Sequence, residues 1–338
     1  MATSKESHAM TDSGESDEIG PALAPARQPT LKTISKITGL AVATVSRALL
    51  DAPDIGNDTK IRVREVADRV GYRPNRAGVR LRTGKTNVVS LVLSTTHEMT
   101  NQHTGRLISS IAGGLRATPY HLIVTPYFPN EDPMRPVEYI VETQSADAII
   151  LNQTEPDDPR IAYLLKKGLP FATHGRSKWS DSHAYYDFDN SRFGELGIEQ
   201  FARRNRKSVL IVAPPSTQSY SGHLVGGAMQ RARDLGLQAI VLEGATSDSQ
   251  TDIVEPAFAA HMAAHPETDA IICPSTIAAM TIVSCAEDMG LTIGTDIDVF
   301  AKQASSFLRK FRAAILPVDE DVGLAGDFLA KAVIHRIQ

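Results

Sequence analysis

Residues 30–85 carry the strongest pattern in the chain and read TLKTISKITGLAVATVSRALLDAPDIGNDTKIRVREVADRVGYRPNRAGVRLRTGK. Two short helices are predicted here, one over residues 33–37 that ends at Gly39 and one over residues 42–50. Gly39 suits this turn because helices commonly end on a left-handed residue, a conformation that costs glycine nothing. Two short helices joined by a tight turn form a helix-turn-helix unit. Its expected core consists of Ile34, Ile37, Leu40, Val45 and Leu49.

The charge of this segment differs from that of the whole chain. Residues 30–85 hold twelve Lys and Arg against five Asp and Glu, a balance of +7, whereas the whole chain has a net charge of −4. Such a basic block is expected of a protein that contacts the phosphate backbone of a nucleic acid. A basic helix that is merely solvated is the alternative, and the coincidence of the charge with the helix-turn-helix pattern disfavours it.

The rest of the sequence excludes several classes of protein. The chain has 338 residues and only two cysteines, Cys273 and Cys285, with no metal-ligand spacing around them, which argues against a disulfide scaffold or a zinc site. It contains no run of eighteen apolar residues, so no transmembrane helix is expected. Its first residues also lack the apolar core of a signal peptide.

The segments on either side of the two short helices have distinct compositions. Residues 1–29 are rich in Ser, Ala, Pro and acids, and we expect a disordered arm. A third helix is predicted over residues 59–72, which Pro74 stops. The headpiece is therefore predicted at residues 30–74 and a hinge or linker at residues 75–86.

From residue 87 onward, short apolar runs alternate with helical patterns. This alternation predicts parallel sheets that are covered by helices on both faces. Two series of similar size predict two doubly wound subdomains within a core of residues 87–338. We expect subdomain one at about 87–187 plus 316–338 and subdomain two at about 188–315. Ligands of such sheets bind beyond the carboxyl ends of the strands, which here means a cleft between the subdomains.

Several spaced motifs resemble those of the LacI/GalR family of bacterial transcription regulators. They are Thr30-Leu31, Gly39-Leu40, Thr44-Val45-Ser46-Arg47 and the GYRPNRA run at 71–77. The resemblance covers residues 30–338. It implies an α/β chain, with an all-α helix-turn-helix headpiece followed by two doubly wound parallel-sheet subdomains like those of periplasmic sugar-binding proteins. It also implies a homodimer that binds pseudo-palindromic, double-stranded operator DNA and responds to a small-molecule effector.

The resemblance assigns DNA contacts to residue positions in the headpiece and hinge. Val42 and Ala43 would open the recognition helix and contact thymine methyl groups or make shape contacts, while Leu81 would act as the minor-groove wedge. The full set of expected DNA-binding residues is Leu31, Lys32, Val42, Ala43, Thr44, Ser46, Arg47, Thr59, Tyr72, Asn75, Arg76, Arg80 and Leu81.

The resemblance also assigns effector contacts to loops at the strand ends. The expected residues are His97, His174, Arg176, Trp179, His223, Ser275, Thr276, Lys302 and Gln303. At these positions the family's usual carboxylates are largely replaced by hydrogen-bond donors, so we expect a cleft that mostly lacks carboxylates. Such a cleft suits a disaccharide, a glycoside or a sugar acid. Each residue also has a structural interpretation; His174 could be a satisfied core histidine and Trp179 could pack under its loop.

The whole chain could be a ligand-responsive DNA-binding regulator, a free sugar-binding module or an enzyme. The favoured one is a cytoplasmic, nucleoid-associated repressor that a carbohydrate effector releases from its operator, with no cofactor, no metal and no membrane partner. The alternatives are an effector that acts as co-repressor, or a free sugar-binding module without a DNA role. An enzyme is disfavoured because nucleophile-elbow, phosphate-loop and zinc-protease motifs are missing from the sequence.

Overall fold

The computed structural model describes residues 28–73, 78, 80, 83–95, 102–128 and 130–338. The chain divides into two compact units, a headpiece that ends at Thr83 and a core that runs from Gly84 to Gln338. Among the described residues, no helix has the length and apolar character needed to cross a membrane.

The headpiece is built from three helices, which are α1 (Leu31–Thr38), α2 (Val42–Leu49) and α3 (Asn57–Arg69). α1 begins earlier than expected because the Thr33 hydroxyl accepts a hydrogen bond from the Thr30 backbone N–H, at 3.1 Å. As expected, α1 ends on Gly39 in the left-handed conformation, with φ 71°. α3 ends earlier than expected, and Gly71 just beyond it has a positive φ of 67°.

The headpiece core is formed by all three helices. Its buried members are Ile34, Val45, Ala48, Val63, Val66 and Ala67. The expectation that Ile37 belongs to this core is wrong, because its side chain is 45% exposed. Ile34 and Thr38, four residues apart, are buried on one face of α1, and Ile37 lies on the flank of that face. The Thr38 hydroxyl donates to the Ile34 carbonyl at 2.8 Å, which satisfies it there.

The core contains two parallel five-stranded sheets with the same topology. The first has the order β2-β1-β3-β4-β5 and the second the order β7-β6-β8-β9-β10. The strands of the first sheet are β1 (Val88–Ser94), β2 (His121–Tyr127), β3 (Ala148–Asn152), β4 (Phe171–His174) and β5 (Ala184–Tyr186). Those of the second are β6 (Ser208–Ile211), β7 (Gln238–Val241), β8 (Ala270–Cys273), β9 (Asp298–Gln303) and β10 (Leu316–Asp319).

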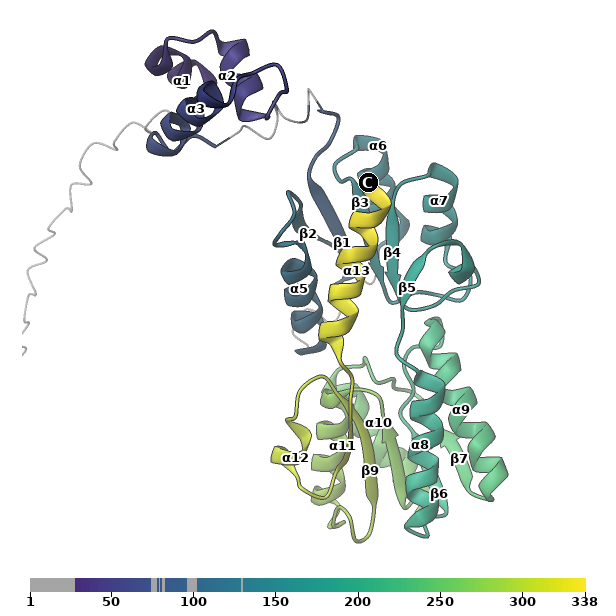
Figure 1. Ribbon diagram of the computed structural model, residues 1–338. Coiled ribbons are helices and arrows are strands. Elements are labelled where there is room, and N and C mark those ends of the chain that lie inside the picture. The colour runs from purple at the N-terminus through teal and green to yellow at the C-terminus, as the bar shows by residue number, and fades with distance from the viewer. Residues whose placement is uncertain (1–27, 74–77, 79, 81–82, 96–101, 129) are drawn as a thin grey trace, which may run out of the picture. The chain divides into compact units, whose positions relative to one another are not determined.

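Helices cover both faces of each sheet, as Figure 1 shows for the core. The first sheet has α5 (Gln102–Leu115) and α13 (Val322–Ile337) on one face and α6 (Met134–Thr143) and α7 (Pro159–Lys167) on the other. The second has α8 (Asn190–Arg203) and α9 (Ser219–Leu235) opposite α10 (Thr251–Ala264) and α11 (Thr276–Asp288). The described part of the core also contains two short helices, η2 (Ser180–Ser182) and α12 (Leu308–Phe311).

Alternation along β1, an inner strand of the first sheet, explains why helices cover both faces of that sheet. Val89, Leu91 and Leu93 of β1 pack against α5 and α13, while Val88 and Val92 face the cluster of α6 and α7. Successive side chains of a strand point to opposite faces, so a strand with buried apolar side chains on both faces needs an apolar partner on each side. The predicted fold class, with two doubly wound subdomains after a helical headpiece, is confirmed.

The chain crosses between the subdomains after β5 and returns after β10. β10 pairs with β9 in the second sheet, in the register Leu316 to Phe300, whereas α13 packs on the first sheet. Residues 316–319, which we expected in subdomain one, therefore lie in subdomain two, and the boundary moves to follow Asp319. A short apolar strand cannot be assigned to one of two similar sheets from its own residues.

Helices α8 and α9 pack closely against each other at two glycines. A Cβ atom at Gly227 would overlap the backbone of Ser191, and one at Gly194 would lie 2.5 Å from the Leu224 carbonyl oxygen. Backbone atoms in a packed helix cannot move aside as the end of a flexible side chain can. The close packing of this helix pair therefore requires glycine at both positions.

Replacing Gly227 tests this helix contact. We expect Gly227→Ala to lower the free energy of unfolding by about 1–3 kcal/mol, the usual cost of overpacking. Gly226→Ala is the matched control, because a Cβ atom there meets nothing within 4 Å and alanine favours the helix by up to about 1 kcal/mol. Urea unfolding followed by circular dichroism measures both. Equal stabilities of the two variants would contradict the packing argument.

Candidate DNA-binding and effector sites

The expected recognition helix, α2, has a buried apolar inner face and an exposed outer face. Val45 and Ala48 are fully buried in the headpiece core. Val42 is 39% exposed and Ala43 is also exposed, although both are apolar. An exposed pair of small apolar side chains at the start of this helix is the arrangement needed to contact thymine methyl groups.

The other expected DNA contacts are less uniform. Lys32, Arg47 and Arg80 are exposed and Thr44, Ser46 and Thr59 are partly buried. Leu31 and Tyr72 pack against the headpiece core, so their side chains also have a structural role. Arg47 forms an ion pair with Asp54, which DNA would have to replace. Asn75, Arg76 and Leu81 lie outside the described residues.

A pocket lies where the carboxyl ends of both sheets meet. Its volume is about 110 Å³. Five of the expected effector residues line it, namely His174, Ser275, Thr276, Lys302 and Gln303. Arg176, Trp179 and His223 are not among its lining residues, and His97 lies outside the described part of the chain.

Lys302 is the central cation of the pocket. It is the second-last residue of β9, is 9% exposed, and forms an ion pair with Glu320 in which Nζ and Oε2 are 3.0 Å apart. Its Nζ also donates to Asn190 Oδ1 at 3.1 Å and lies 4.7 Å from the centre of the Phe188 ring. Burial alone would raise the pKa of Glu320, but the charge of Lys302 and the hydrogen bond from His103 outweigh it and lower that pKa.

Hydrogen bonds hold the side chains of three other polar residues that line the pocket. The Ser275 hydroxyl caps α11 by accepting from the Ala278 N–H, and the Thr276 hydroxyl donates to the Lys302 carbonyl at 3.3 Å. Gln303 donates through Nε2 to Asp319 at 2.9 Å. These bonds give the side chains fixed positions, which a specific binding site requires.

Two histidines face each other on the first-sheet side of the pocket. The rings of His103 and His174 are stacked with centroids 5.5 Å apart. Nδ1 of His174 is 3.0 Å from Asn152 Oδ1, and His103 Nε2 is 3.4 Å from Glu320 Oε1. Burial lowers the pKa of His174 to about 4, and the neighbouring His103 acts in the same direction.

Arg176 and Trp179 take structural positions beside the pocket. Arg176 Nε donates to Asp187 Oδ2 at 2.7 Å, so it orients a carboxylate that does line the pocket. Burial raises the pKa of Asp187, and Arg176 opposes that rise. Trp179 packs against the apolar cluster of α6 and α7, and Lys178 Nζ lies 4.4 Å from the centre of its ring.

The expectation of a cleft that mostly lacks carboxylates is wrong. Asp187, Asp248 and Glu320 all line the pocket. Asp187 and Glu320 belong to the two crossovers, and Asp248 lies on a loop after β7 that we did not assign to the cleft. The prediction considered only loops that directly follow the other strands, so it missed the carboxylates that the crossovers bring in.

Hydrogen bonds cross the cleft directly. The Ser219 N–H donates to the Thr154 carbonyl at 2.9 Å, and Gln153 Nε2 donates to Asp248 Oδ2 at 3.5 Å. In each pair, one residue follows β3 of the first sheet and the other belongs to subdomain two. The pocket is therefore a shared surface of both subdomains. Asn152, Gln153, Tyr220 and His103 also line it and were not among the expected effector contacts.

A helix-turn-helix headpiece joined to a two-subdomain core with a polar cleft defines a ligand-responsive transcription regulator. Residues 106–325 match the family described as periplasmic binding proteins and sugar binding domain of the LacI family, and residues 30–75 match the bacterial regulatory proteins of the lacI family. The chain belongs to the LacI family of bacterial regulatory proteins.

Individual proteins resemble it over nearly its full length. The HTH-type transcriptional regulator AglR of Rhizobium meliloti (strain 1021) is 29% identical over 315 residues, which cover 91% of this chain and 87% of that protein. The Lac repressor dimer bound to operator and the anti-inducer ONPF has a TM-score of 0.80 at 16% identity, covering 92% and 93% of the two chains. The CelR–cellobiose complex has a TM-score of 0.67 at 19% identity, covering 91% and 93%. These two structures share the fold.

Val42 provides a test of the DNA-binding face. We expect Val42→Ala to weaken discrimination at one base pair of the operator by about 1 kcal/mol, because a methyl contact is lost. The slope of affinity against salt should not change, since no phosphate contact is removed. Ile61→Ala, which truncates another exposed aliphatic side chain, on α3, is the control. Fluorescence anisotropy with single-base operator variants measures both, and equal discrimination by wild type and Val42→Ala would refute the contact.

The lowered pKa of His174 predicts a pH dependence of stability. The folded-state pKa is about 4, whereas an unfolded histidine has a pKa of about 6.5. Between these values the unfolded chain binds a proton that the folded chain does not, so stability falls as the pH drops through this window. This group should contribute a loss of about 3 kcal/mol by pH 4. Urea unfolding at pH 7 to 4.5 should show a shallower loss for His174→Gln; equal slopes would contradict this.

Proposed function

We propose that this protein is a repressor that a small carbohydrate releases from its operator. The observation that supports this best is the composition of the pocket, because its lining comes from both sheets and from both crossovers. A ligand shifts a conformational equilibrium only if it binds the two states differently. A ligand that touches both subdomains meets this condition, since a change in their separation alters its contacts.

The polarity of the pocket suits a carbohydrate. Asp187, Asp248 and Glu320 accept hydrogen bonds, while Lys302 donates them. Tyr220 also lines the pocket and provides an aromatic face of the kind that packs against a sugar ring. The related CelR structure is a complex with cellobiose, which supports a disaccharide, a glycoside or a sugar acid as the effector class. Arg176 and His223 enter this proposal as neighbours of Asp187.

The start of the core offers a path for the signal. Thr86 N, Thr86 Oγ1 and Asn87 N each donate to the Asp147 carboxylate at 2.9 Å. These three bonds fasten Thr86, the last residue of the hinge that we propose at residues 75–86, and its neighbour Asn87 to Asp147, which directly precedes β3 of the first sheet. Movement of subdomain one would therefore be passed to the linker rather than absorbed by it.

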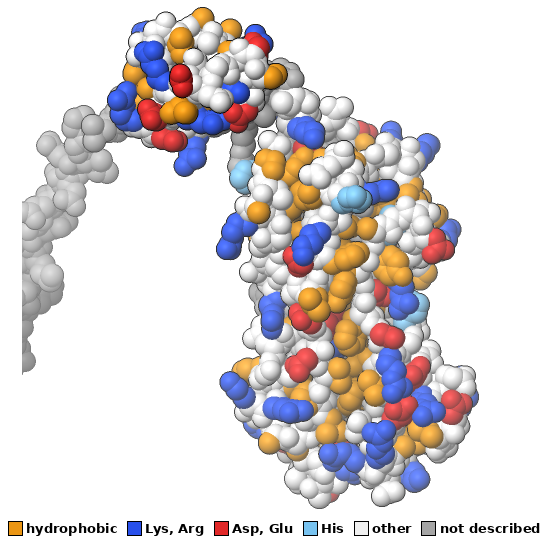
Figure 2. Space-filling view, viewed as in Figure 1, with side chains coloured by type: hydrophobic (Ala, Val, Ile, Leu, Met, Phe, Trp, Pro, Cys, Tyr) orange, Lys and Arg blue, Asp and Glu red, His pale blue; other side chains and the backbone are white. Residues whose placement is uncertain are grey.

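The active form in this proposal is a homodimer on a pseudo-palindromic operator. A single headpiece buries too little surface for tight specific binding, and the two-fold symmetry of a dimer matches that of the operator. Hydrophobic side chains form a band over α13 on the face shown in Figure 2. Leu324 and Phe328 of α13 are 59% and 41% exposed, which is expected of a surface that a second copy covers. Because its proposed target is operator DNA, we propose that the protein acts in the cytoplasm, on the nucleoid.

The proposed DNA contacts are those of the outer face of α2, where Val42 and Ala43 meet base methyl groups and Ser46 and Arg47 supply polar contacts. Lys32 would add a phosphate contact. We propose binding without catalysis, so the sugar should be recovered chemically unchanged after incubation with the protein.

A titration of sugars against an operator fragment tests the function. The operator is obtained by selection from random DNA, and a sugar panel is screened by thermal shift. Binding of the active sugar is then measured by calorimetry with and without operator. We expect operator to weaken sugar binding about 5–150-fold, and sugar to weaken operator binding by the same factor. Tighter sugar binding with operator would indicate a co-repressor, and failure to select any operator would indicate a free sugar-binding module.

Asp248→Asn tests whether the effector binds in this pocket. It removes one pocket charge and should weaken sugar binding at least about 10-fold, since a charged acceptor contributes roughly 1.5–3 kcal/mol. Operator affinity without sugar should be retained. Asp252→Asn makes the same change at an exposed position in the first turn of α10 and should behave as wild type. Unchanged sugar affinity in Asp248→Asn would place the effector site elsewhere.

A further inference from the structure

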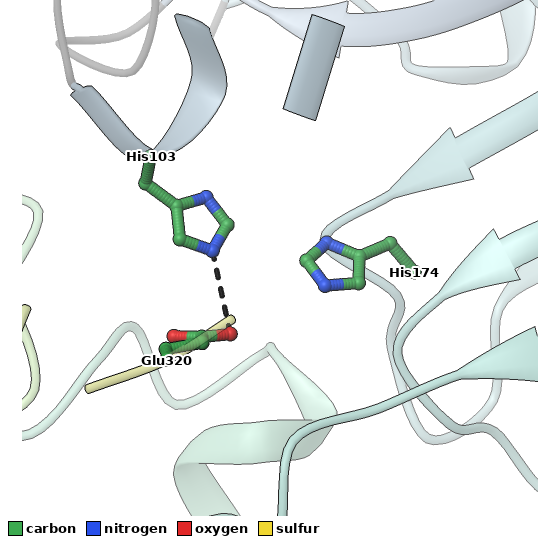
Figure 3. A group of neighbouring side chains, drawn as sticks. All are labelled: His103, His174 and Glu320. Carbon is green, nitrogen blue, oxygen red and sulfur yellow. Dashed lines mark ion pairs between the residues drawn. The ribbon is translucent and has the colours of Figure 1, made fainter. Parts of the chain in front are cut away.

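Three side chains from distant parts of the sequence meet at the edge of the pocket. His103 lies near the start of α5, His174 ends β4, and Glu320 begins the crossover from β10 to α13. One nitrogen from each imidazole and one carboxylate oxygen all lie within 4.8 Å of one another. Figure 3 shows the two rings and the carboxylate directed toward a common space.

We propose that His103, His174 and Glu320 bind a divalent transition-metal ion, for which Zn²⁺ is the best probe. Two imidazoles and one carboxylate form a ligand set that Zn²⁺ accepts in open sites with three protein ligands. Imidazole also suits Cu²⁺, Ni²⁺ and Fe²⁺, whereas Mg²⁺ and Ca²⁺ prefer oxygen alone. This site goes beyond the proposed regulatory function, because it binds its ion without DNA or sugar.

The distances between the ligand atoms of the three side chains are close to those around a bound metal ion. Ligand atoms about 2.0–2.1 Å from a tetrahedral Zn²⁺ are about 3.3 Å from one another. His103 Nε2 and Glu320 Oε1 are 3.4 Å apart, which is long for a charge-assisted hydrogen bond but matches one edge of that tetrahedron. The largest separation in the group, within 4.8 Å, needs side-chain movement of only about 1.5 Å to reach the same edge length.

The neighbour of His174 favours the tautomer that binds a metal. An amide oxygen only accepts hydrogen bonds, so the contact with Asn152 Oδ1 at 3.0 Å assigns the hydrogen to Nδ1 of His174. Nε2 then carries a free lone pair. Metal-binding histidines commonly donate their second N–H to such an outer partner, which fixes the orientation of the ring.

The positive charge of Lys302 disfavours a cation at this site, and the carboxylates of the pocket offset that charge. Lys302 contacts Oε2 of Glu320, which leaves Oε1 facing His103. A carboxylate can bind an ammonium through one oxygen and a metal through the other. The pocket also contains Asp187 and Asp248, so its lining has three carboxylates against one lysine. Its volume of about 110 Å³ accommodates several water molecules, which supply the remaining coordination position.

A second pair of histidines could also bind Zn²⁺, and binding there has to be distinguished from binding at this site. His261 and His265 lie four residues apart at the end of α10, with ring centroids 4.9 Å apart. Nδ1 of His265 is 3.3 Å from Glu267 Oε1. A histidine pair on a helix surface can itself capture Zn²⁺, so His265→Ala serves as the control that removes one histidine outside the pocket.

The test uses the full-length, untagged protein after treatment with a chelator, with Zn²⁺ added by isothermal titration in a buffer that does not bind metals. We expect one Zn²⁺ per chain at the pocket. His103→Ala and His174→Ala should each weaken it at least about 100-fold, because even outer partners of metal ligands are worth 10–100-fold. Asn152→Ala should weaken it about 10–100-fold. His265→Ala should bind at the pocket as wild type does.

Two further measurements keep the result independent of folding defects. Operator binding and the unfolding temperature report whether each variant is folded; His103, 27% exposed, is the more tolerant position. Co²⁺ added to the wild type should give the intense visible absorption of a four- or five-coordinate site, which requires no mutation. Weak absorption like that of hydrated Co²⁺, no Zn²⁺ binding, or binding lost only in His265→Ala would each overturn the proposal. None of these outcomes depends on operator release by a sugar.

Discussion

The arrangement of the core depends on one buried ammonium group. Lys302 reaches Asn190, where the chain has just entered subdomain two, and Glu320, where it leaves again. Both members of the ion pair are almost fully buried, and a lone charge there would cost several kcal/mol. Each therefore requires the other. A single lysine at the end of β9 thus ties together the two connections about which the subdomains would have to move, and it does so inside the proposed effector pocket.

The fold could be predicted from the sequence because its signals are local. Apolar runs alternating with helical patterns predicted two parallel sheets, and Gly39 predicted the turn of the headpiece. Errors occurred where local information was insufficient. Ile37 is apolar but lies on the flank of a helix too short for its period to be clear. The residues of β10 were placed in the wrong subdomain, because only tertiary pairing with β9 decides where that strand belongs.

The site was predicted less completely, for a physical reason. Lys302, Gln303, Ser275, Thr276 and His174 follow or end strands, and their position in a parallel sheet brings them to the cleft. His103 and Glu320 reach it differently: one begins a helix, and the other belongs to a crossover whose path depends on how the subdomains pack. The sequence was searched for a metal site only around its cysteines. His103, His174 and Glu320 form no short motif, because they are separated by 71 and 146 residues. Arg176 was found correctly as a strand-end residue, but its ion pair with Asp187 turns it to the side of the pocket.

The chain order of the two subdomains has a consequence for synthesis on the ribosome. Subdomain two is continuous from α8 to β10, so it has all its parts once residue 319 has emerged. Subdomain one is discontinuous: its cluster on the α5 face takes Val322, Ala325, Leu329, Ala330 and Val333 from α13, which follows subdomain two in the chain. We therefore expect the second half of the core to fold first during translation, while one apolar face of the first sheet stays uncovered until α13 has emerged. Such a transiently exposed surface is where chaperones bind and nascent chains aggregate.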